Sequence, residues 1–272
     1  MAYNLLKGKR GIITGALDQN SIAWKVAEKA HEEGATFVLT NAPIAMRMGE
    51  INGLAEKTNS KIIPADATSV EELTNLFTES QQILGGKIDF VLHSIGMSVN
   101  IRKKIAYPEL NYDYYAKGVD VSAMSLHKML SVAYNMDALN EEASVVALTY
   151  AAAQRTYPFY TDMADIKALL ESIARSFGYH YGLKKRVRVN TVSQSPTKTT
   201  AGTGIKGFGD FFDYANAIAP LGNASAEDCA NYCITLFSDL TKMVTMQNLF
   251  HDGGYSTTGV SDLIMKKAGI AE

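Results

Sequence analysis

The feature that most constrains the fold of this 272-residue chain is the alternation of short apolar runs with longer segments of helical periodicity. The expected strands cover residues 10–14, 36–40, 61–64, 88–93, 144–149, 188–193 and 248–252. The expected helices cover residues 22–33, 70–84, 120–136, 163–181 and 226–237. Such alternation is typical of βαβ units, and continuous Val/Ile/Leu runs indicate strands covered on both faces. The sequence therefore predicts an α/β fold: one doubly wound (Rossmann) domain over residues 1–272, with a mostly seven-stranded parallel sheet.

Composition narrows the classes of function. Hydrophobic residues make up 47% and charged residues 20% of the chain, as in a globular protein with a full core. A net charge of −2 indicates no general attraction to nucleic acid or to an anionic membrane. We see no signal peptide and no apolar run of the ~18 residues that a membrane span requires, so we expect a cytoplasmic protein. Cys229 and Cys233 stand four apart in a helical pattern and are expected to be buried and reduced, since the further ligands of a metal site are not evident.

A glycine-containing turn follows the first expected strand. Gly15 ends that strand, and Ser21 and Ile22 open the first expected helix. Glycine lets the backbone turn sharply toward a pyrophosphate, and the amides at the helix N-terminus supply hydrogen-bond donors. No glycine lies between Gly15 and Gly34, so the full G-x-G-x-x-G fingerprint is absent. Taken alone, the turn leaves an ordinary β–α connection as the alternative.

Residues at the ends of later strands strengthen the prediction of a dinucleotide site, because open α/β sheets bind ligands beyond the carboxyl ends of their strands. Asp66 follows the third strand, where it can meet an adenine edge. Residues 94–96 follow the fourth strand, and Pro196 and Thr199 follow the sixth, where they can close over the carboxamide. The expected cofactor contacts are Gly15, Ser21, Ile22, Ala42, Asp66, Ala67, Ser94, Ile95, Gly96, Lys167, Pro196, Thr197 and Thr199.

The end of the second strand bears on the choice of cofactor. Its sequence, Leu-Thr-Asn-Ala-Pro at residues 39–43, carries neither the acid that often binds the 2′-hydroxyl of NAD nor a clear basic site for the 2′-phosphate of NADP. Arg47 could reach a 2′-phosphate, but an exposed Arg in such a segment usually faces solvent. We therefore expect NADH as the cofactor and keep NADPH as the less favoured alternative.

Two tyrosines and a lysine form the expected catalytic group. Tyr150, Tyr160 and Lys167 lie within one segment, and Pro158 disfavours helix just before Tyr160. On a helix, positions seven apart share nearly one face and lie roughly 10 Å apart along the axis. Lys167 can therefore point at the cofactor ribose while Tyr160 reaches over the substrate. Tyr157 is the alternative to Tyr160.

Several motifs follow one another in order along the chain. They are G-(x)5-S-I-A from Gly15, the turn at Asp66, H-S-I-G from His93, Y-(x)9-Y-(x)6-K ending at Lys167, R-V-N-(x)2-S-(x)2-P-x-K-T from Arg188, and H-D-G-G from His251. In order and spacing they resemble the NADH-using bacterial enoyl-acyl-carrier-protein reductases, a divergent branch of the short-chain dehydrogenases/reductases. The chain departs from the usual pattern of that family at Asp165, Gln194 and Ser195.

The resemblance implies an activity and residue roles. In the family, the tyrosine matching Tyr160 hydrogen-bonds the thioester carbonyl, the lysine matching Lys167 binds the nicotinamide ribose, and the tyrosine matching Tyr150 lines the substrate pocket. The implied reaction is the reduction of a trans-2-enoyl thioester on acyl carrier protein with NADH, in fatty acid elongation, by a homotetramer. One alternative is a short-chain reductase acting on a ketone, which usually has a tyrosine four residues before the lysine, where this chain has Met163. The other is a non-catalytic dinucleotide-binding protein.

The stretch 197–214 is expected to be a mobile flap over the substrate. Gly202, Gly204, Gly207 and Gly209 lie in it, and glycine loses the most backbone freedom on folding. Apolar residues of the same stretch could cover an acyl chain. The expected substrate contacts are Met97, Tyr150, Tyr160, Ile205 and Phe208. The alternative is a permanently packed helix pair, because residues 208–219 could form a regular helix.

Overall fold

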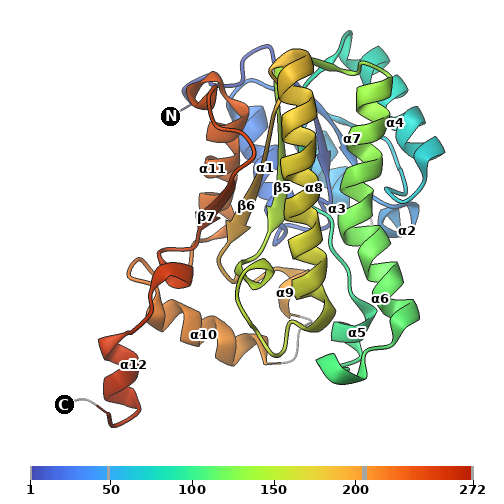
Figure 1. The fold of residues 1–272 in the computed structure, drawn as a ribbon. Helices are drawn as coiled ribbons and strands as arrows, with labels where there is room; N and C mark the ends of the chain where they lie inside the picture. Colours follow the sequence, from blue (N-terminus) through green and yellow to red (C-terminus); the bar gives the residue numbers. More distant parts are fainter. Residues whose placement is uncertain (1, 48–49, 204–206, 271–272) are drawn as a thin grey trace.

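Seven parallel strands form one sheet in the order β3-β2-β1-β4-β5-β6-β7 (Figure 1). The computed structural model describes residues 2–47, 50–203 and 207–270. The strands are β1 (Arg10–Thr14), β2 (Thr36–Thr40), β3 (Lys61–Ile62), β4 (Ile88–His93), β5 (Leu139–Thr149), β6 (Arg188–Gln194) and β7 (Asn248–His251). The strand order reverses direction between β1 and β4, as in a doubly wound sheet. The predicted fold class is therefore confirmed.

Two strands differ from their predicted bounds by more than one residue. β3 pairs with β2 at only two positions and is shorter than predicted. β5 begins at Leu139, five residues before the predicted start at 144, because its first residues pair with β4 across a register shift between Ile88 and Phe90. Such an irregularity depends on the partner strand and leaves no local sequence pattern.

Helices cover both faces of the sheet (Figure 1). The longer ones are α1 (Ile22–Glu32), α3 (Glu50–Thr58), α4 (Val70–Leu84), α6 (Tyr112–Val119), α7 (Ser125–Asn135), α8 (Thr161–Lys185), α10 (Phe208–Ile218) and α11 (Ala226–Phe237). Short helical segments are α2 (Pro43–Met46), α5 (Val99–Arg102), α9 (Thr200–Thr203) and α12 (Asp262–Lys267). The predicted helix 120–136 consists of a short π-helix, η2 (Asp120–Met124), that follows α6, and of α7. The predicted helix 163–181 is longer at both ends, as α8.

Side chains that alternate along the strands divide the core into two layers. Ile12 packs with the side chains beneath α4, α7 and α8, whereas Ile13 packs with those beneath α1, α3 and α11. Successive residues of a strand point to opposite faces, so a continuous apolar run serves both layers. Figure 1 shows α7 and α8 side by side in front of the sheet and α1 and α11 on the other side. Cys229 and Cys233 are free and buried in the α11 layer, as predicted.

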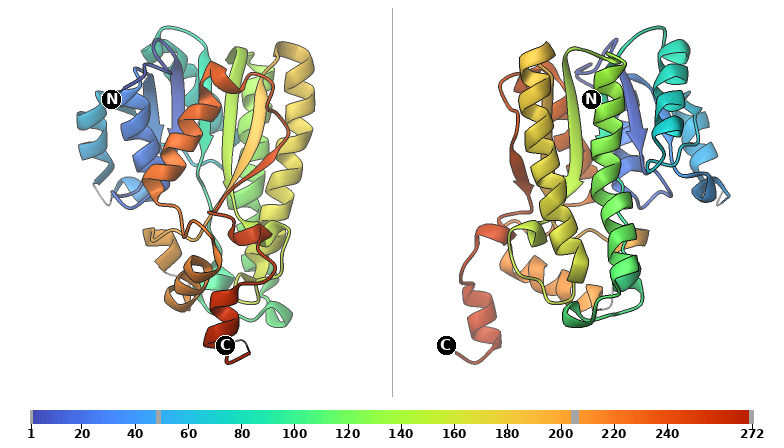
Figure 2. Two further views of the ribbon diagram at one scale, coloured as in Figure 1. Left: turned by 90° about the vertical axis from the view of Figure 1, so that its left-hand side faces the viewer. Right: turned by 45° about the vertical axis from the view of Figure 1, so that its right-hand side comes forward.

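The remaining elements lie beyond the carboxyl edge of the sheet. α10 and α12 lie next to each other there, and α12 projects away from the sheet (Figures 1 and 2). Within the described ranges, none of the helices combines the length and the hydropathy needed to cross a bilayer. The same ranges contain no cluster of three or more potential metal ligands.

Candidate active site

The candidate site lies beyond β1 and β4, the neighbouring strands at which the sheet changes direction. Gly15, directly after β1, has φ +83°, and a Cβ there would lie 2.0 Å from the carbonyl oxygen of Ser94, directly after β4. Only glycine tolerates this approach. Gly15 therefore brings the first turn against residues 94–96, which contain three of the predicted cofactor contacts.

Asp18 organises the turn between β1 and α1. Its Oδ1 accepts a hydrogen bond from the N–H of Asn20 at 2.9 Å, and its carbonyl oxygen accepts one from the Ser21 hydroxyl at 2.7 Å. The Ser21 hydroxyl also accepts from the N–H of Leu17 at 3.3 Å and does not cap α1. The first amides of α1 are therefore left for an anionic ligand such as a pyrophosphate. Sequence reasoning missed Asp18, although an Asp in a tight turn is a recognisable signal.

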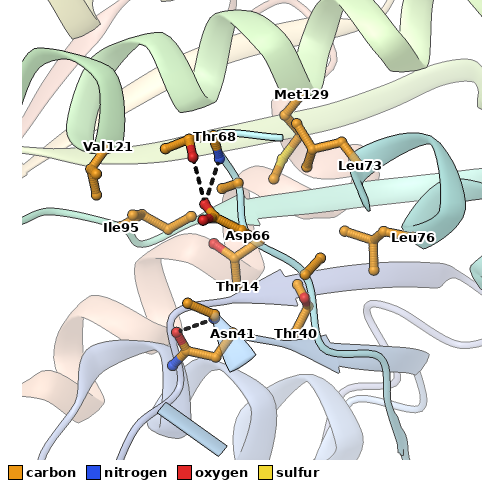
Figure 3. A pocket seen from close by; sticks show the side chains of 13 residues that line it. Thr14, Thr40, Asn41, Asp66, Thr68, Leu73, Leu76, Ile95, Val121 and Met129 are labelled. Carbon is orange, nitrogen blue, oxygen red and sulfur yellow. Dashed lines mark hydrogen bonds between the residues drawn. The ribbon is translucent and has the colours of Figure 1, made fainter. Parts of the chain in front are cut away.

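A cavity of about 60 Å³ lies beside this turn (Figure 3). The predicted cofactor contacts Ala42, Asp66, Ala67 and Ile95 all line it. Oδ1 of Asp66 accepts hydrogen bonds from the N–H and the hydroxyl of Thr68, at 2.9 and 2.8 Å, which orients the carboxylate at the cavity wall. Val121 and Met129 add apolar lining. They belong to η2 and α7, and helical periodicity alone gave no signal for this role.

A neutral residue stands at the end of β2. The side chain of Asn41 donates to the carbonyl oxygen of Ala16 at 3.0 Å and accepts from the N–H of Ala42 at 2.9 Å. Asn41 therefore occupies the position where an acid often binds the 2′-hydroxyl. Arg47 is exposed just after α2.

Lys167 points from α8 toward the end of β5. Its ammonium donates to the carbonyl oxygen of Leu148 at 2.7 Å, and its side chain is 7% exposed. Burial lowers the pKa of Lys167 to about 8. A Cβ at Gly96 would lie 3.8 Å from its Nζ, so the loop after β4 passes close to this ammonium. Burial and the charge of Lys167 together lower the pKa of His93 to about 3, so His93 is neutral; its Nε2 lies 2.9 Å from the Ser125 hydroxyl.

The two predicted tyrosines lie together. Tyr150 follows β5, Tyr160 precedes α8, and their ring centroids are 5.0 Å apart. Burial raises the pKa of both phenols, so both are protonated at neutral pH. The hydroxyl of Tyr150 is buried without a hydrogen-bond partner among the residues that the structure describes. Thr161, a β-branched residue, has φ +40° directly after Tyr160, and such strain is often found at functional sites.

One aromatic side chain of the predicted flap lies beside Tyr150 and Tyr157. The ring of Phe211 in α10 lies 6.5 Å from that of Tyr150 and 5.6 Å from that of Tyr157, measured between centroids. Phe208, the predicted substrate contact, packs instead against Phe212 at 6.0 Å. Ile205 lies outside the described residues. Phe211 thus lies beside Tyr150 and Tyr157, a position that depends on the phase of α10, which the sequence did not define.

The start of the flap contacts the cofactor turn. The hydroxyl of Thr200 donates to Oδ2 of Asp18, which lies 182 positions earlier in the chain. The hydroxyl of Thr197 accepts from Nε2 of Gln194 at 3.2 Å, and that of Thr199 accepts from the N–H of Gly202 at 3.0 Å. The predicted contacts Pro196, Thr197 and Thr199 therefore lie on a segment that reaches the first turn. Met97, predicted to contact substrate, is held through its backbone N–H and carbonyl oxygen by the hydroxyl of Ser122.

A doubly wound sheet with a glycine turn after β1 and a Tyr/Lys pair at α8 defines the class of short-chain dehydrogenases/reductases. The family model described as "Enoyl-(Acyl carrier protein) reductase" matches residues 15–256, and the chain belongs to this family. The enoyl-[acyl-carrier-protein] reductase [NADH] FabI of Rickettsia bellii is 32% identical over 266 residues, covering 97% of this chain and 100% of the relative.

A second relative and two solved structures agree with this assignment. The enoyl-[acyl-carrier-protein] reductase [NADH] 1 of Rhizobium meliloti is 32% identical, with 95% of this chain and 94% of the relative covered. The FabI–NADH complex of Alistipes finegoldii is 62% identical, with a TM-score of 0.96 over 97% of this chain and 93% of that one. The enoyl-[acyl-carrier-protein] reductase (NADH) of Aquifex aeolicus is 28% identical, with a TM-score of 0.87 over 94% of this chain and 99% of that one.

Proposed function

We propose that this protein is an NADH-dependent enoyl-acyl-carrier-protein reductase that reduces trans-2-enoyl thioesters to saturated acyl thioesters in fatty acid elongation. The observation that carries the proposal is the placement of the phenols relative to Lys167. Four residues before Lys167, where ketone-reducing relatives have a tyrosine, Met163 is 5% exposed and packs in the core. The rings of Tyr160 and Tyr150 lie 5.0 Å apart between centroids, and the ring of the alternative, Tyr157, lies 5.4 Å from that of Tyr150. The family resemblance implies the same arrangement, with the tyrosine seven residues before the lysine and not four.

The residues that follow β1, β2 and β3 fit NADH. Gly15 lets the first turn approach the loop after β4, the amides that open α1 are not capped by Ser21, and the largely apolar cavity has the Asp66 carboxylate at its wall, as an adenine ring and its edge require. Asn41, a neutral residue at the end of β2, adds no positive charge for a 2′-phosphate. The chemistry that NADH supplies when bound is a hydride for the β-carbon of the enoyl thioester.

The side chains around Lys167 have distinct proposed roles. As the β-carbon is reduced, negative charge collects on the thioester oxygen, and the protonated phenol of Tyr160 donates a hydrogen bond to that oxygen. Lys167 binds the ribose hydroxyls through its ammonium and so orients the cofactor. The unpartnered hydroxyl of Tyr150 lines the proposed substrate pocket, and it gains a hydrogen-bond partner when substrate binds. Phe211 closes the pocket on the side of α10.

The oxidation of NADH with two thioesters tests this proposal. We expect rapid oxidation with a short trans-2-enoyl thioester and little with a 3-ketoacyl thioester, and NADPH should be the poorer cofactor. Robust ketoacyl reduction without enoyl reduction would instead make the protein a carbonyl reductase. A clear preference for NADPH would assign Arg47 to phosphate binding.

We also propose that the protein is a cytoplasmic homotetramer and that it receives its substrate on acyl carrier protein. The last turns of α8 support an assembly, because Tyr179 and Leu183, four apart on that helix, are 56% and 74% exposed. Apolar patches of this kind often mark subunit interfaces, and closed symmetric assemblies are the common outcome. Solution scattering at micromolar concentration should report a tetramer, and a monomer would contradict the proposal.

A further inference from the structure

Glu171 lies one helical turn after Lys167 on α8, and it is 3% exposed. A carboxylate this deeply buried is costly unless donors surround it. Its Oε1 accepts a hydrogen bond from the hydroxyl of Thr149 at 2.9 Å, and its Oε2 accepts one from the side-chain amide of Gln154 at 2.9 Å. Both donors are neutral, so these bonds stabilise the carboxylate without cancelling its charge.

The two donors lie on either side of Tyr150. Thr149 is the last residue of β5, and Gln154 follows the 3₁₀ turn η3 (Ala151–Ala153). The carboxylate of Glu171 therefore ties the segment that carries Tyr150 to the helix that carries Lys167. Because the Tyr150 hydroxyl has no partner within the described ranges, the position of its ring depends on this tie and on packing against neighbouring rings.

Glu171 follows Lys167 by four residues, and positions four apart are neighbours on one face of a helix. Its charge therefore lies on the same face of α8 as Lys167. Its negative charge raises the pKa of Lys167, while burial lowers it. Burial raises the pKa of Glu171 itself, whereas the hydrogen bonds from Gln154 and Thr149 and the charge of Arg175, four residues further along α8, lower it.

The neighbouring His93, Tyr150 and Tyr160 carry no negative charge at neutral pH. His93, from β4, is neutral because its pKa lies near 3. The phenols of Tyr150 and Tyr160 are protonated, because burial raises their pKa values. Asp120, in η2, pairs with Lys128 at 2.6 Å. Glu171 is the carboxylate whose charge opposes the effect of burial on the pKa of Lys167.

We propose that Glu171 is a positioning residue of the reductase site: its carboxylate keeps Lys167 in the ammonium form that binds the cofactor ribose, and it fixes the segment that carries Tyr150. The proposal rests on the proposed function for the role of Tyr150. Its first part concerns cofactor binding alone and holds whatever the substrate is.

The first experiment measures NADH affinity against pH for the parent and Glu171→Gln, by quenching of protein fluorescence between pH 6 and 10. Binding should weaken as pH rises through the pKa of Lys167. In Glu171→Gln this loss should begin about one pH unit lower, the size of effect that a close opposite charge has on a pKa. At pH 8 the variant should therefore bind NADH several-fold more weakly, and the two proteins should converge near pH 6. An unshifted pH profile would overturn the proposal.

Two further variants separate the effect of the negative charge of Glu171 from the effect of its hydrogen bonds to the segment that carries Tyr150. Gln154→Ala removes one hydrogen bond and keeps the carboxylate, so its pH profile should match the parent, while kcat with an enoyl thioester falls several-fold. Glu79→Gln makes the same substitution at an exposed carboxylate of α4 and should change neither quantity. A parent-like kcat in Gln154→Ala would remove the second part of the proposal.

A separate variant guards against loss of folding. Glu171→Met replaces the carboxylate by an apolar side chain of similar length, which buried positions often accept. It should show the same displaced pH profile as Glu171→Gln. If neither variant folds, the role of Glu171 is structural and the proposal is wrong. If the parent binds NADH but reduces no enoyl thioester, the proposed function fails while the pH profiles still decide the role of Glu171.

Discussion

Replacing Gly15 by alanine tests how closely the first turn must approach the loop after β4. Gly15 has φ +83°, and its new Cβ would lie 2.0 Å from the carbonyl oxygen of Ser94, a backbone atom that cannot rotate away. The left-handed conformation costs alanine about 1–2 kcal/mol. Relieving the contact requires a backbone shift, and such overpacking costs about 1–3 kcal/mol. Together these predict a loss of about 2–5 kcal/mol of unfolding free energy.

Gly8→Ala is the matched control. Gly8 has φ +78°, but no atom lies within 4 Å of its ideal Cβ, so it carries only the conformational cost of about 1–2 kcal/mol. In urea unfolding, the unfolding free energy of Gly15→Ala should be lower than that of Gly8→Ala by about 1–3 kcal/mol, the cost of relieving the contact with Ser94. NADH titration should show at least about tenfold weaker binding in Gly15→Ala alone, since the displaced turn is the expected pyrophosphate site. Equal stability and equal NADH affinity in the two variants would refute the reasoning.

Three further predictions concern the proposed catalytic residues and the flap. Tyr160→Phe should bind NADH like the parent and lose roughly 10²–10³-fold in kcat, as when one donor to a developing oxyanion is removed; if Tyr157→Phe shows this loss instead, the assigned tyrosine is wrong. Lys167→Ala should raise the KM for NADH and lower kcat together, because the ribose contact serves both ground and transition states; an unchanged KM would argue against that contact. Hydrogen exchange in residues 197–214 should slow strongly when NADH and a substrate analogue bind, and equal exchange with and without ligand would identify this segment as ordinary scaffold.

Much of the fold could be predicted because it follows from local patterns. Continuous apolar runs such as that containing Ile12 and Ile13 must be covered on both faces, and the longer helical periods between them require parallel connections. The misplaced bounds have non-local causes. β5 extends to Leu139 through its register with β4, and α8 begins at Thr161 in a backbone conformation that a β-branched residue rarely adopts.

By itself, the sequence determined the fold class, because this depends on periodicity; together with the family resemblance it also predicted the ligand-binding edge of the sheet and the motif residues Gly15, Tyr160 and Lys167. Only the tertiary structure decided which residues support them. The bond between Thr200 and Asp18 joins positions 182 apart, and the bond between Thr149 and Glu171 joins a strand end to a helix. Contacts across such separations depend on how whole elements pack, so they leave no period or spacing in the chain from which they could be predicted.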